Sequence, residues 1–582
     1  MRKTAAVLTV ALILCLVPGM LSAQSAEDTK FKKFQDTFWD AYFKFFPTTG
    51  TIEGYSKYRD KVEDFSSSAV EKFHDALDGF NQELVSKIDK SKLSPENRID
   101  CDMMLDFLDL EFMKFENLLP WEYNPLFYNE IFVESIRSLL AGTPQAPDAL
   151  NSATSRAKSL PGLIKKAKDL LKTPPEAYTR EAIQQMPGII DYYRTEAPKF
   201  CGSATGLQTE LAKVATALED YRNFLQNQLL PRSTGNFRLA EAHLRTLRMK
   251  SQGILSIGQE VVARSQADYN NIRREMLLVC IPFFKLMYPQ IDIEQLGQSK
   301  GEEGTRQVII QGVIDKLKSD HTGRNEYIAA ISASADKIRK FIQDKDLAPI
   351  PPETLKIEPM PPYLPAKTWT LLEGPGAFEP PGNYTIFVKQ IPADWPQEQA
   401  DSLLEEYNTF YLDFMTAQKI FPGTFVPSVL ARKNASPTRK MTGNAALIKG
   451  WPIYINEKLI MAGYNGYDLK TRLSQLKLQL KNVILFQLDM NVHEGSYTKG
   501  KTIEVMTVNG FMTPAEAEKE WTRILLNPGD ASLAYIGYQE IKDLEKDYIN
   551  LKGQAFSSKD FLSKLLDFGP LPLRVLKTKL AN

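Results

Sequence analysis

The chain has 582 residues, of which 43% are hydrophobic and 24% charged, and its 71 basic side chains balance its 71 acidic ones. A chain of this length can form roughly two to four lobes of about 150 residues, each with a core of its own. Because neither sign of charge is in excess, the composition does not favour nucleic acid or an anionic membrane surface as a bulk partner.

Residues 1–23 predict a cleaved secretory signal peptide. Arg2 and Lys3 precede an apolar run over residues 5–17, which is too short to span a bilayer comfortably, and Ala23 supplies the small residue needed for cleavage. The alternative is an uncleaved anchor. Cys15 follows Leu14 rather than a small residue, so we do not expect a lipoprotein signal. No later segment predicts a membrane span, so the mature chain is expected to be exported, either to the periplasm or to the extracellular medium.

Residues 24–345 predict an N-terminal helical region. Phe34, Phe38 and Tyr42 recur at helical spacing, and Pro47 is expected to end that helix. The aromatic and methionine stripes of this region are typical of a packed core. The pattern further predicts a helix interrupted at Pro161 and stopped at Pro174, and then long helices over about 177–229, 237–289 and 304–344.

Residues 346–395 are rich in proline, which excludes a continuous helix. The runs "TWTLLEG" and "NYTIFVKQ" predict short strands, and hence a small sheet or hairpin. Residues 396–582 predict a C-terminal helical region, with one helix leading directly into Gln418 and the next starting at Pro452; further helices are expected over about 467–490, 513–526, 531–550 and 558–567. The predicted fold class is therefore mainly α with a small β element.

Neither cysteine nor histidine spacing reveals a metal or redox site. Cys101, Cys201 and Cys280 form no Cys-x-x-Cys pair; one disulfide with one free thiol remains an alternative to three buried thiols, which we expect. The four histidines are His74, His243, His321 and His493, and none is four residues from another. Only His493, with Asp489 and Glu494 beside it, offers a candidate metal cluster. Nucleophile-elbow, P-loop and dinucleotide motifs are absent.

Several segments, taken in order, resemble a known family. "FFPTTGTIEGYSKYRD", "LLKTPPEAYTREAI" and "FLSKLLDFGPLPLRVL" are similar to segments of the bacterial family called domain of unknown function 885 (DUF885), over the whole mature chain. Its members are exported and zincin-like. The resemblance implies a large multi-helix zincin-like (gluzincin-type) architecture with the small sheet near a cleft. Members that resemble active metallopeptidases carry His-Glu-x-x-Pro-Gly-His-His and, farther on, Glu-Gly-Trp, which bind zinc and supply the general base.

The stretch "QKIFPGTF" aligns with that motif through Pro422 and Gly423, but its chemistry differs. Gln418 stands in place of the first histidine and Lys419 in place of the glutamate, while Thr424 and Phe425 replace the later histidines. In the second motif Gly450 and Trp451 remain, and Lys449 replaces the glutamate. An ammonium group repels a divalent cation and cannot ligate it, so the zinc that the resemblance implies for the family is not expected here, and no residue is assigned as a metal ligand or catalytic group.

Other family positions are better kept. Asp489 and His493 resemble an Asp-x-Gly-x-His segment, and Arg523 matches an arginine of the last motif; together with Glu494 these are the candidate cleft residues. We hypothesise that Lys419 and Lys449 fill the space of the metal and pair with an acid such as Asp489 or Glu494. The alternative is that both lysines point to solvent.

The sequence therefore predicts an exported, catalytically inactive homologue of zinc metallopeptidases that retains a cleft for a peptide or a protein partner. Two alternatives stay open: an active hydrolase or metallopeptidase with a rearranged site near His493, and a helical scaffold without a ligand. Whether the chain is an enzyme is left undecided, leaning towards no.

Overall fold

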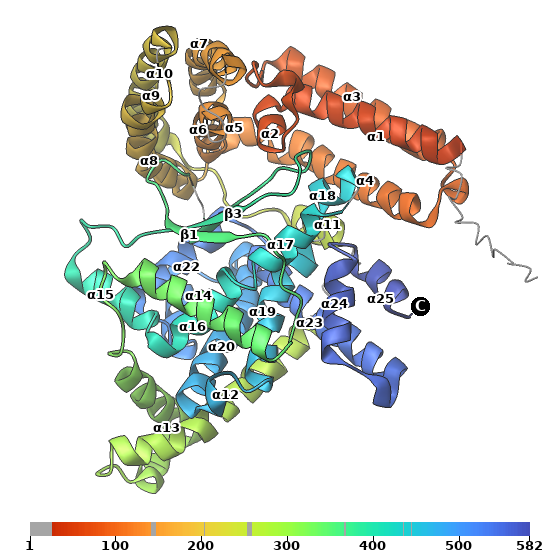
Figure 1. Cartoon of the computed structure of the whole chain (residues 1–582). Helices are drawn as coiled ribbons and strands as arrows, with labels where there is room; N and C mark the ends of the chain where they lie inside the picture. Colours follow the sequence, from red (N-terminus) through yellow and green to blue (C-terminus); the bar gives the residue numbers. More distant parts are fainter. Residues whose placement is uncertain are drawn as a thin grey trace, which may run out of the picture.

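A computed structural model describes residues 26–140, 147–202, 204–252, 259–365, 368–434, 436–443 and 445–581. The predicted signal peptide over residues 1–23 lies outside these ranges. In the described part the chain is mainly helical, with one small sheet, as the sequence predicts. Figure 1 shows a group of helices from the first part of the chain above the sheet and most of the remaining helices below it, while α18 (Pro437–Thr442) lies beside the upper group. None of the described helices is both long and apolar enough to cross a bilayer.

The upper group packs around its own core. Phe34, Phe38 and Tyr42 are buried on the first helix, as the aromatic spacing predicts. Its helices are α1 (Ala26–Phe45), α2 (Pro47–Ile52), α3 (Ser67–Ser86), α4 (Pro95–Met113), α5 (Pro120–Tyr123), α6 (Pro125–Leu140), α7 (Pro147–Leu170), α8 (Glu176–Asp191), α9 (Ala197–Lys199) and α10 (Thr205–Phe224).

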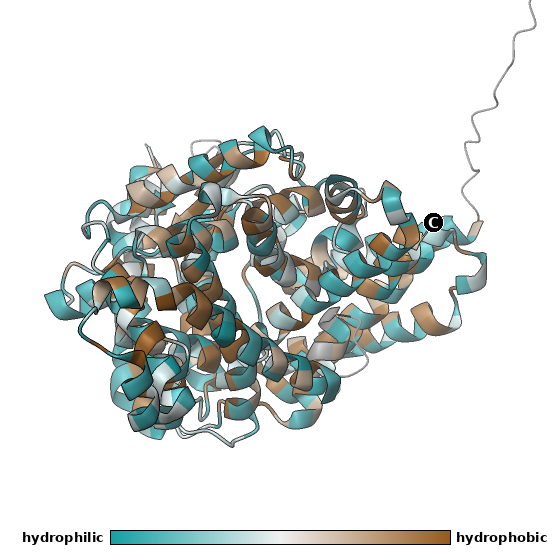
Figure 2. Cartoon of the chain, turned by 90° about the horizontal axis from the view of Figure 1, so that it is seen from below, coloured by the Kyte–Doolittle hydropathy of each residue, from teal (hydrophilic) through white to brown (hydrophobic). Residues whose placement is uncertain are grey.

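The lower group holds two further cores and combines helices from distant parts of the sequence. It comprises α11 (Glu241–Gln252), which also contacts α4, and α12 (Gln259–Met287), α13 (Ile293–Leu317), α14 (Tyr327–Asp344), α15 (Gln397–Glu406), α16 (Thr409–Lys419), α17 (Phe425–Arg432), α18 (Pro437–Thr442), α19 (Ala445–Met461), α20 (Leu469–His493), α21 (Lys499–Glu504), α22 (Pro514–Leu526), α23 (Asp530–Lys552), α24 (Ser558–Asp567) and α25 (Leu573–Ala581). Most of these helices carry both hydrophobic and hydrophilic residues (Figure 2).

The sheet has three strands in the order β1-β3-β2. They are β1 (Leu355–Pro359), β2 (Thr370–Glu373) and β3 (Tyr384–Val388). Strand β1 runs parallel to β3 with Ile357 opposite Ile386, and β2 runs antiparallel with Thr370 opposite Val388. The two runs of the sequence analysis form β2 and β3, which is confirmed, whereas β1 was not predicted.

Several predicted helix boundaries were wrong, and the reasons are local. The helix α7 continues through Pro161, and α19 begins at Ala445 and continues through Pro452. Leu160 and Leu163 are buried in one helix and Trp451 in the other, so tertiary packing outweighs the missing proline N–H. The predicted helix over 304–344 is broken between α13 and α14. The helix before Gln418 is broken at Asn408, whose side chain accepts the Tyr411 backbone N–H at 3.2 Å and so caps α16.

The three cysteines are free and buried, as expected. Ion pairs join the upper group to the sheet and the lower group: Arg439 Nε lies 2.5 Å from Asp100 Oδ1, Arg432 Nη1 2.8 Å from Glu53 Oε2, and Arg137 Nη2 2.6 Å from Glu373 Oε1.

Candidate functional site

The segment 418–425 turns sharply at the end of α16. The Gly423 N–H donates to the Ala417 carbonyl oxygen at 2.9 Å, and the Thr424 hydroxyl donates to the Lys419 carbonyl oxygen at 2.9 Å. A Cβ atom on Gly423 would lie 2.3 Å from the Gln418 carbonyl oxygen, so no larger residue fits. The Pro-Gly pair therefore has a structural role here that does not depend on the chemistry of its neighbours.

Gln418, at the position of the first motif histidine, is buried in a network of amides. Its Nε2 donates to Asn482 Oδ1 at 3.1 Å, and its Oε1 accepts from Asn482 Nδ2 at 3.2 Å and from Asn456 Nδ2 at 3.4 Å. The three side chains come from α16, α20 and α19. Neutral hydrogen bonds thus satisfy both polar atoms of the Gln418 amide.

The second motif lies on α19, against α23. A Cβ atom on Gly450 would lie 2.2 Å from the Gly537 carbonyl carbon, so the two helices touch at their backbones. Trp451 is fully buried beside this contact. Lys449 is partly exposed and forms a close ion pair with Asp530, the first residue of α23.

From Asp530 a series of ion pairs continues along α22. Arg523 joins Asp530 Oδ2 at 2.8 Å to Glu520 Oε2 at 2.6 Å. Lys481 on α20 pairs with Glu520 Oε1 at 3.0 Å and closely with Glu516, and Lys519 Nζ lies 2.6 Å from Glu516 Oε2. We call these seven residues the charged chain: Lys449, Lys481, Glu516, Lys519, Glu520, Arg523 and Asp530.

The charged chain is largely buried, so its pKa values depend on the pairing. Burial alone would raise the pKa of Asp530, but Lys449 and Arg523 hold it at about 2. Arg523 and Lys481 likewise hold the pKa of Glu520 well below its usual range against the effect of burial. Burial would lower the pKa of Lys481, yet Glu516 and Glu520 raise it well above the ordinary lysine value. All three groups are therefore ionised at neutral pH.

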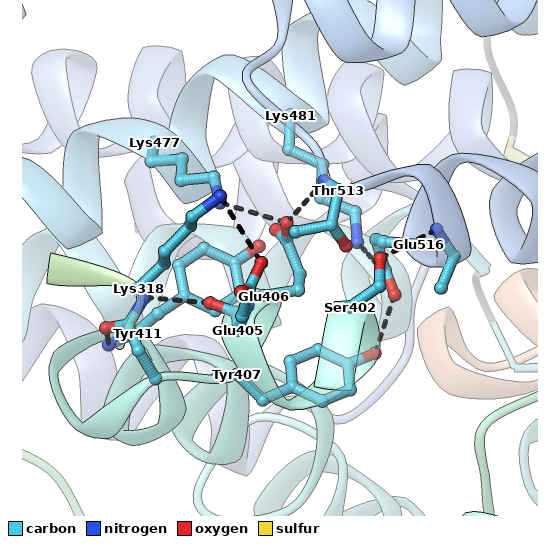
Figure 3. Close-up of polar contacts among 12 residues, drawn as sticks. Lys318, Ser402, Glu405, Glu406, Tyr407, Tyr411, Lys477, Lys481, Thr513 and Glu516 are labelled. Carbon is cyan, nitrogen blue, oxygen red and sulfur yellow. Dashed lines mark hydrogen bonds and ion pairs between the residues drawn. The ribbon is translucent and has the colours of Figure 1, made fainter. Parts of the chain in front are cut away.

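Further polar contacts extend the charged chain beneath the sheet (Figure 3). The Tyr407 hydroxyl donates to Glu516 Oε2 at 2.9 Å. Lys477, one helical turn before Lys481 on α20, donates to Glu406 Oε2 at 2.9 Å, and the same oxygen accepts the Thr513 backbone N–H at 2.9 Å. The lysines of α20 thus meet acids on both α15 and α22.

Lys419, at the position of the motif glutamate, stands apart from these pairs. It is partly buried, and in the described part of the chain its Nζ has no hydrogen-bond acceptor and no carboxylate within 4 Å. Burial, reinforced by the positive charge of Arg523, lowers its pKa to about 8; Glu520 acts in the opposite direction. Of the two lysines expected to pair with acids, only Lys449 does so, and its partner is Asp530 instead of Asp489 or Glu494.

Asp489 has a structural task. Its Oδ1 accepts the Gly529 N–H at 3.0 Å, and its Oδ2 accepts the Ser532 N–H at 2.9 Å and the Ser532 hydroxyl at 2.5 Å. These are donors at the start of α23, where a carboxylate is favoured. The buried His493 places Nε2 3.2 Å from the Ile524 carbonyl oxygen and 3.7 Å from Asp489 Oδ1, whereas Glu494 is exposed.

The donor set at the motif positions does not fit zinc. Gln418, Lys419, Thr424 and Phe425 offer an amide, an ammonium group, a hydroxyl and a phenyl ring, whereas zinc is bound by imidazoles, thiolates and carboxylates. Within the described ranges, no group of three or more His, Cys, Asp or Glu side chains could hold a metal ion, and this includes the surroundings of His493.

Sequence reasoning missed the extent of the charged chain. Lys477 and Lys481 are four residues apart on α20, and Glu516 and Glu520 are four apart on α22. A spacing of four places each pair on one face of its helix, so two complementary faces were readable from the sequence. Their pairing was not readable, because it joins α20 to α22 across the fold.

Comparison with known proteins places the fold and the family. The model of a family described as "Bacterial protein of unknown function (DUF885)" matches residues 47–580. A structure described as a "putative lipoprotein of unknown function" from Shewanella oneidensis is similar over 95% of this chain and 100% of that one, with a TM-score of 0.74 and 21% identity. A "putative lipoprotein" from Colwellia psychrerythraea gives 0.73 and 14%, over 96% and 99%. No curated protein matches the chain.

Proposed function

The chain belongs to the DUF885 family, and from this premise we propose that it is an exported protein that binds a peptide-like ligand or a partner without hydrolysing it through a metal. The carrying observation is a series of ion pairs beside the positions at which the resemblance implies a metal-binding donor set. Lys449 pairs with Asp530. Lys419, at the position where the resemblance implies a general base, interacts electrostatically with Glu520 and Asp530.

Electrostatics support the absence of metal chemistry. A divalent cation at this position would face the positive charges of Lys419, Lys449 and Arg523, and the carboxylates nearby are already paired with cations. Moving a paired, buried carboxylate onto a metal would leave its lysine or arginine partner without compensation, which is costly.

The solvent-exposed end of the charged chain, at Lys449 and Asp530, supports a ligand-binding role. The side chains of Lys449 and Asp530 are 36% and 28% exposed, so the end of the charged chain reaches solvent. In contrast, Phe421, Phe425 and Trp451 are fully buried, which is the arrangement that the alternative of a scaffold without a ligand expects. The two alternatives therefore make different predictions for Lys449 and Asp530. A ligand-binding protein uses these exposed side chains to contact its ligand, whereas a scaffold without a ligand leaves them in contact with solvent.

A capture experiment tests the proposal. The mature protein is immobilised, incubated with a tryptic digest of serum albumin in the presence of zinc, and the bound and unbound peptides are identified by mass spectrometry. We expect a subset of peptides to be retained without new cleavage. The matched variant Lys449→Glu, which sets two carboxylates against each other, should retain less. Zinc-dependent cleavage would contradict the non-hydrolytic role, and equal retention by the variant would contradict the placement of the ligand.

Export is the second part of the proposal. It rests on the signal-like residues 1–23, and two structures of similar fold are described as putative lipoproteins. Mass spectrometry of the processed N-terminus decides between the two forms of export. Cleavage near Ala23 is expected, whereas a lipid-modified Cys15 would identify a membrane-anchored protein.

A further inference from the structure

A pocket of about 480 Å³ lies in the upper group of helices, between α8 and α10, which pack against each other (Figure 1). Helix α8 ends at Asp191 and continues into the turn Tyr192–Glu196, which carries Arg194, whereas Glu219 and Arg222 lie near the end of α10. These four side chains all line the pocket. Its volume is in the range of small-molecule binding sites, and no residue of the charged chain contributes to it.

Arg222 brings a charged group without a partner to this pocket. In the described part of the chain its guanidinium makes no hydrogen bond and no ion pair, and its Nε is buried without an acceptor, so the two Nη groups form its accessible end. Other arginines nearby are paired: Arg194 lies close to Glu219, and Arg180 Nη2 lies 2.5 Å from a carboxylate oxygen of Glu176. A guanidinium presents a rigid planar fork of donors that matches a carboxylate. Arg222 therefore offers the pocket an unused carboxylate-binding group.

Asp191 brings the opposite charge, also without an ionic partner. It is exposed, its Oδ2 accepts the Thr195 hydroxyl at 3.1 Å, and the described residues place no cationic nitrogen within 4 Å of its carboxylate. The only other ionisable residues that line the pocket are Arg194 and Glu219, which neutralise each other. One positive group, that of Arg222, and one negative group, that of Asp191, therefore remain available to a ligand.

Charged residues just outside the pocket do not alter this balance. Glu196 Oε1 lies 2.7 Å from Lys199 Nζ, and Asp220 Oδ2 lies 2.6 Å from Lys168 Nζ, so each of these acids has a cation of its own. A ligand with a single sign of charge would satisfy one of the two free groups and be repelled by the other. A zwitterion is complementary to both.

The size of the pocket indicates which zwitterion fits. A sphere of this volume is roughly 10 Å across, and an extended chain spans at most about 3.3–3.6 Å per residue, so the pocket has room for two or three amino-acid residues. Ile190, which is buried and also lines the pocket, supplies an apolar wall for side chains of the ligand.

We propose that this pocket binds a short peptide with free termini, whose C-terminal carboxylate bonds to Arg222 and whose N-terminal ammonium group bonds to Asp191. Both contacts are charge-assisted hydrogen bonds, which are stronger than neutral ones. The pocket shares no residue with the charged chain, so it is a second binding site, and the inference does not depend on the proposed function.

Three tripeptides test the proposal by titration calorimetry at pH 7. Trialanine carries both charges, N-acetyl-trialanine lacks the ammonium group, and trialanine amide lacks the carboxylate. We expect the wild type to bind trialanine about tenfold or more tightly than either derivative. Arg222→Met should abolish the preference for trialanine over the amide, and Asp191→Asn should abolish the preference over the acetylated peptide, because each variant lacks the group that recognises the missing charge.

Arg180→Met is the matched control. It removes an exposed guanidinium of the same helix α8 that does not line the pocket, so both preferences should be kept. The thermal midpoint of each variant is measured alongside. Arg222→Met should not lower it, since the guanidinium has no partner in the described part of the protein, and a lost preference then reports on the pocket and not on folding.

The outcomes separate this pocket from the site at the charged chain. No binding of trialanine, or equal binding of the three peptides, would overturn the pocket. If Lys449→Glu loses the preferences while Arg222→Met and Asp191→Asn keep them, the peptide lies at the charged chain, which overturns the pocket and supports the proposed function. If the pocket variants lose the preferences and Lys449→Glu keeps them, the pocket stands whether or not the proposed function does.

Discussion

Lys481→Met tests whether the charged chain is held together by its ion pairs. Lys481 is about nine-tenths buried and touches two carboxylates, Glu520 at 3.0 Å and Glu516 more closely. Removing one partner of a buried pair leaves uncompensated charge, which costs about 3–5 kcal/mol. With an unfolding entropy of about 2.1 cal/mol/K per residue over the whole chain, this corresponds to a fall in thermal midpoint of at least about 2 °C.

The assay is thermal and urea unfolding followed by circular dichroism. Lys501→Met is the matched control, because Lys501 and Glu504 form an exposed pair whose loss should change stability by less than about 0.5 kcal/mol. Adding Glu516→Gln to Lys481→Met removes one of the two facing carboxylates and should recover part of the loss.

The effect should also depend on pH with a definite sign. In the wild type Glu516 and Glu520 have lowered pKa values, so their stabilising contribution is present above pH 4.5 and is lost as the pH falls through their folded values. Without Lys481 the pKa of these carboxylates should rise, and their destabilising effect should fade as the pH decreases from 7 to 5. A loss below 1 kcal/mol at pH 7, or a loss independent of pH, would refute the reasoning.

Three other substitutions probe the surroundings. Asp489→Asn should cost about 1–3 kcal/mol in urea unfolding, because donors at the start of α23 lose their carboxylate, whereas Glu494→Gln on the exposed neighbour should be neutral; equal effects would contradict the capping role. Gly450→Ala should cost about 1–3 kcal/mol or more by forcing α19 from α23, and Gly500→Ala, where nothing lies within 4 Å, should be neutral or slightly stabilising; a tolerated Gly450→Ala would disprove the backbone contact. Lys419→Met should stabilise the protein by about 1–3 kcal/mol at pH 7. The gain in stability should shrink between pH 8 and 10.5, because in that range the lysine of the unfolded chain keeps its proton and that of the folded chain has released it. Destabilisation at pH 7 would show that the ammonium group has a partner.

Local sequence patterns predicted much of the secondary structure. The aromatic spacing of α1 and the strand runs of β2 and β3 depend on neighbouring residues only. The predictions of helix boundaries and strands failed where contacts between residues distant in the sequence determine the structure. The continuation of α7 and α19 through prolines requires packing against other helices, and β1 exists because it pairs with β3.

The same division holds for the site. The sequence shows which residues stand at positions 418, 419 and 449, where the resemblance implies a metal motif, and it shows the paired spacing of lysines on α20. The sequence did not predict that Asp530 is the partner of Lys449. The two residues are 81 positions apart and meet only because Gly450 allows α19 and α23 to touch. Asp489, assigned to the cleft by resemblance, hydrogen-bonds the start of α23.

The most direct test of the central claim, that lysine-centred ion pairs stand in place of a metal site, is the zinc content of the purified mature protein. The native chain and a Gln418→His/Lys419→Glu variant are incubated with zinc, desalted and measured by elemental analysis. The account predicts less than about 0.1 equivalent in the native chain, because the motif positions offer no ligand set and several cations oppose the ion. One equivalent retained by the native chain would contradict it and would make His493 and its neighbouring acids the first residues to mutate.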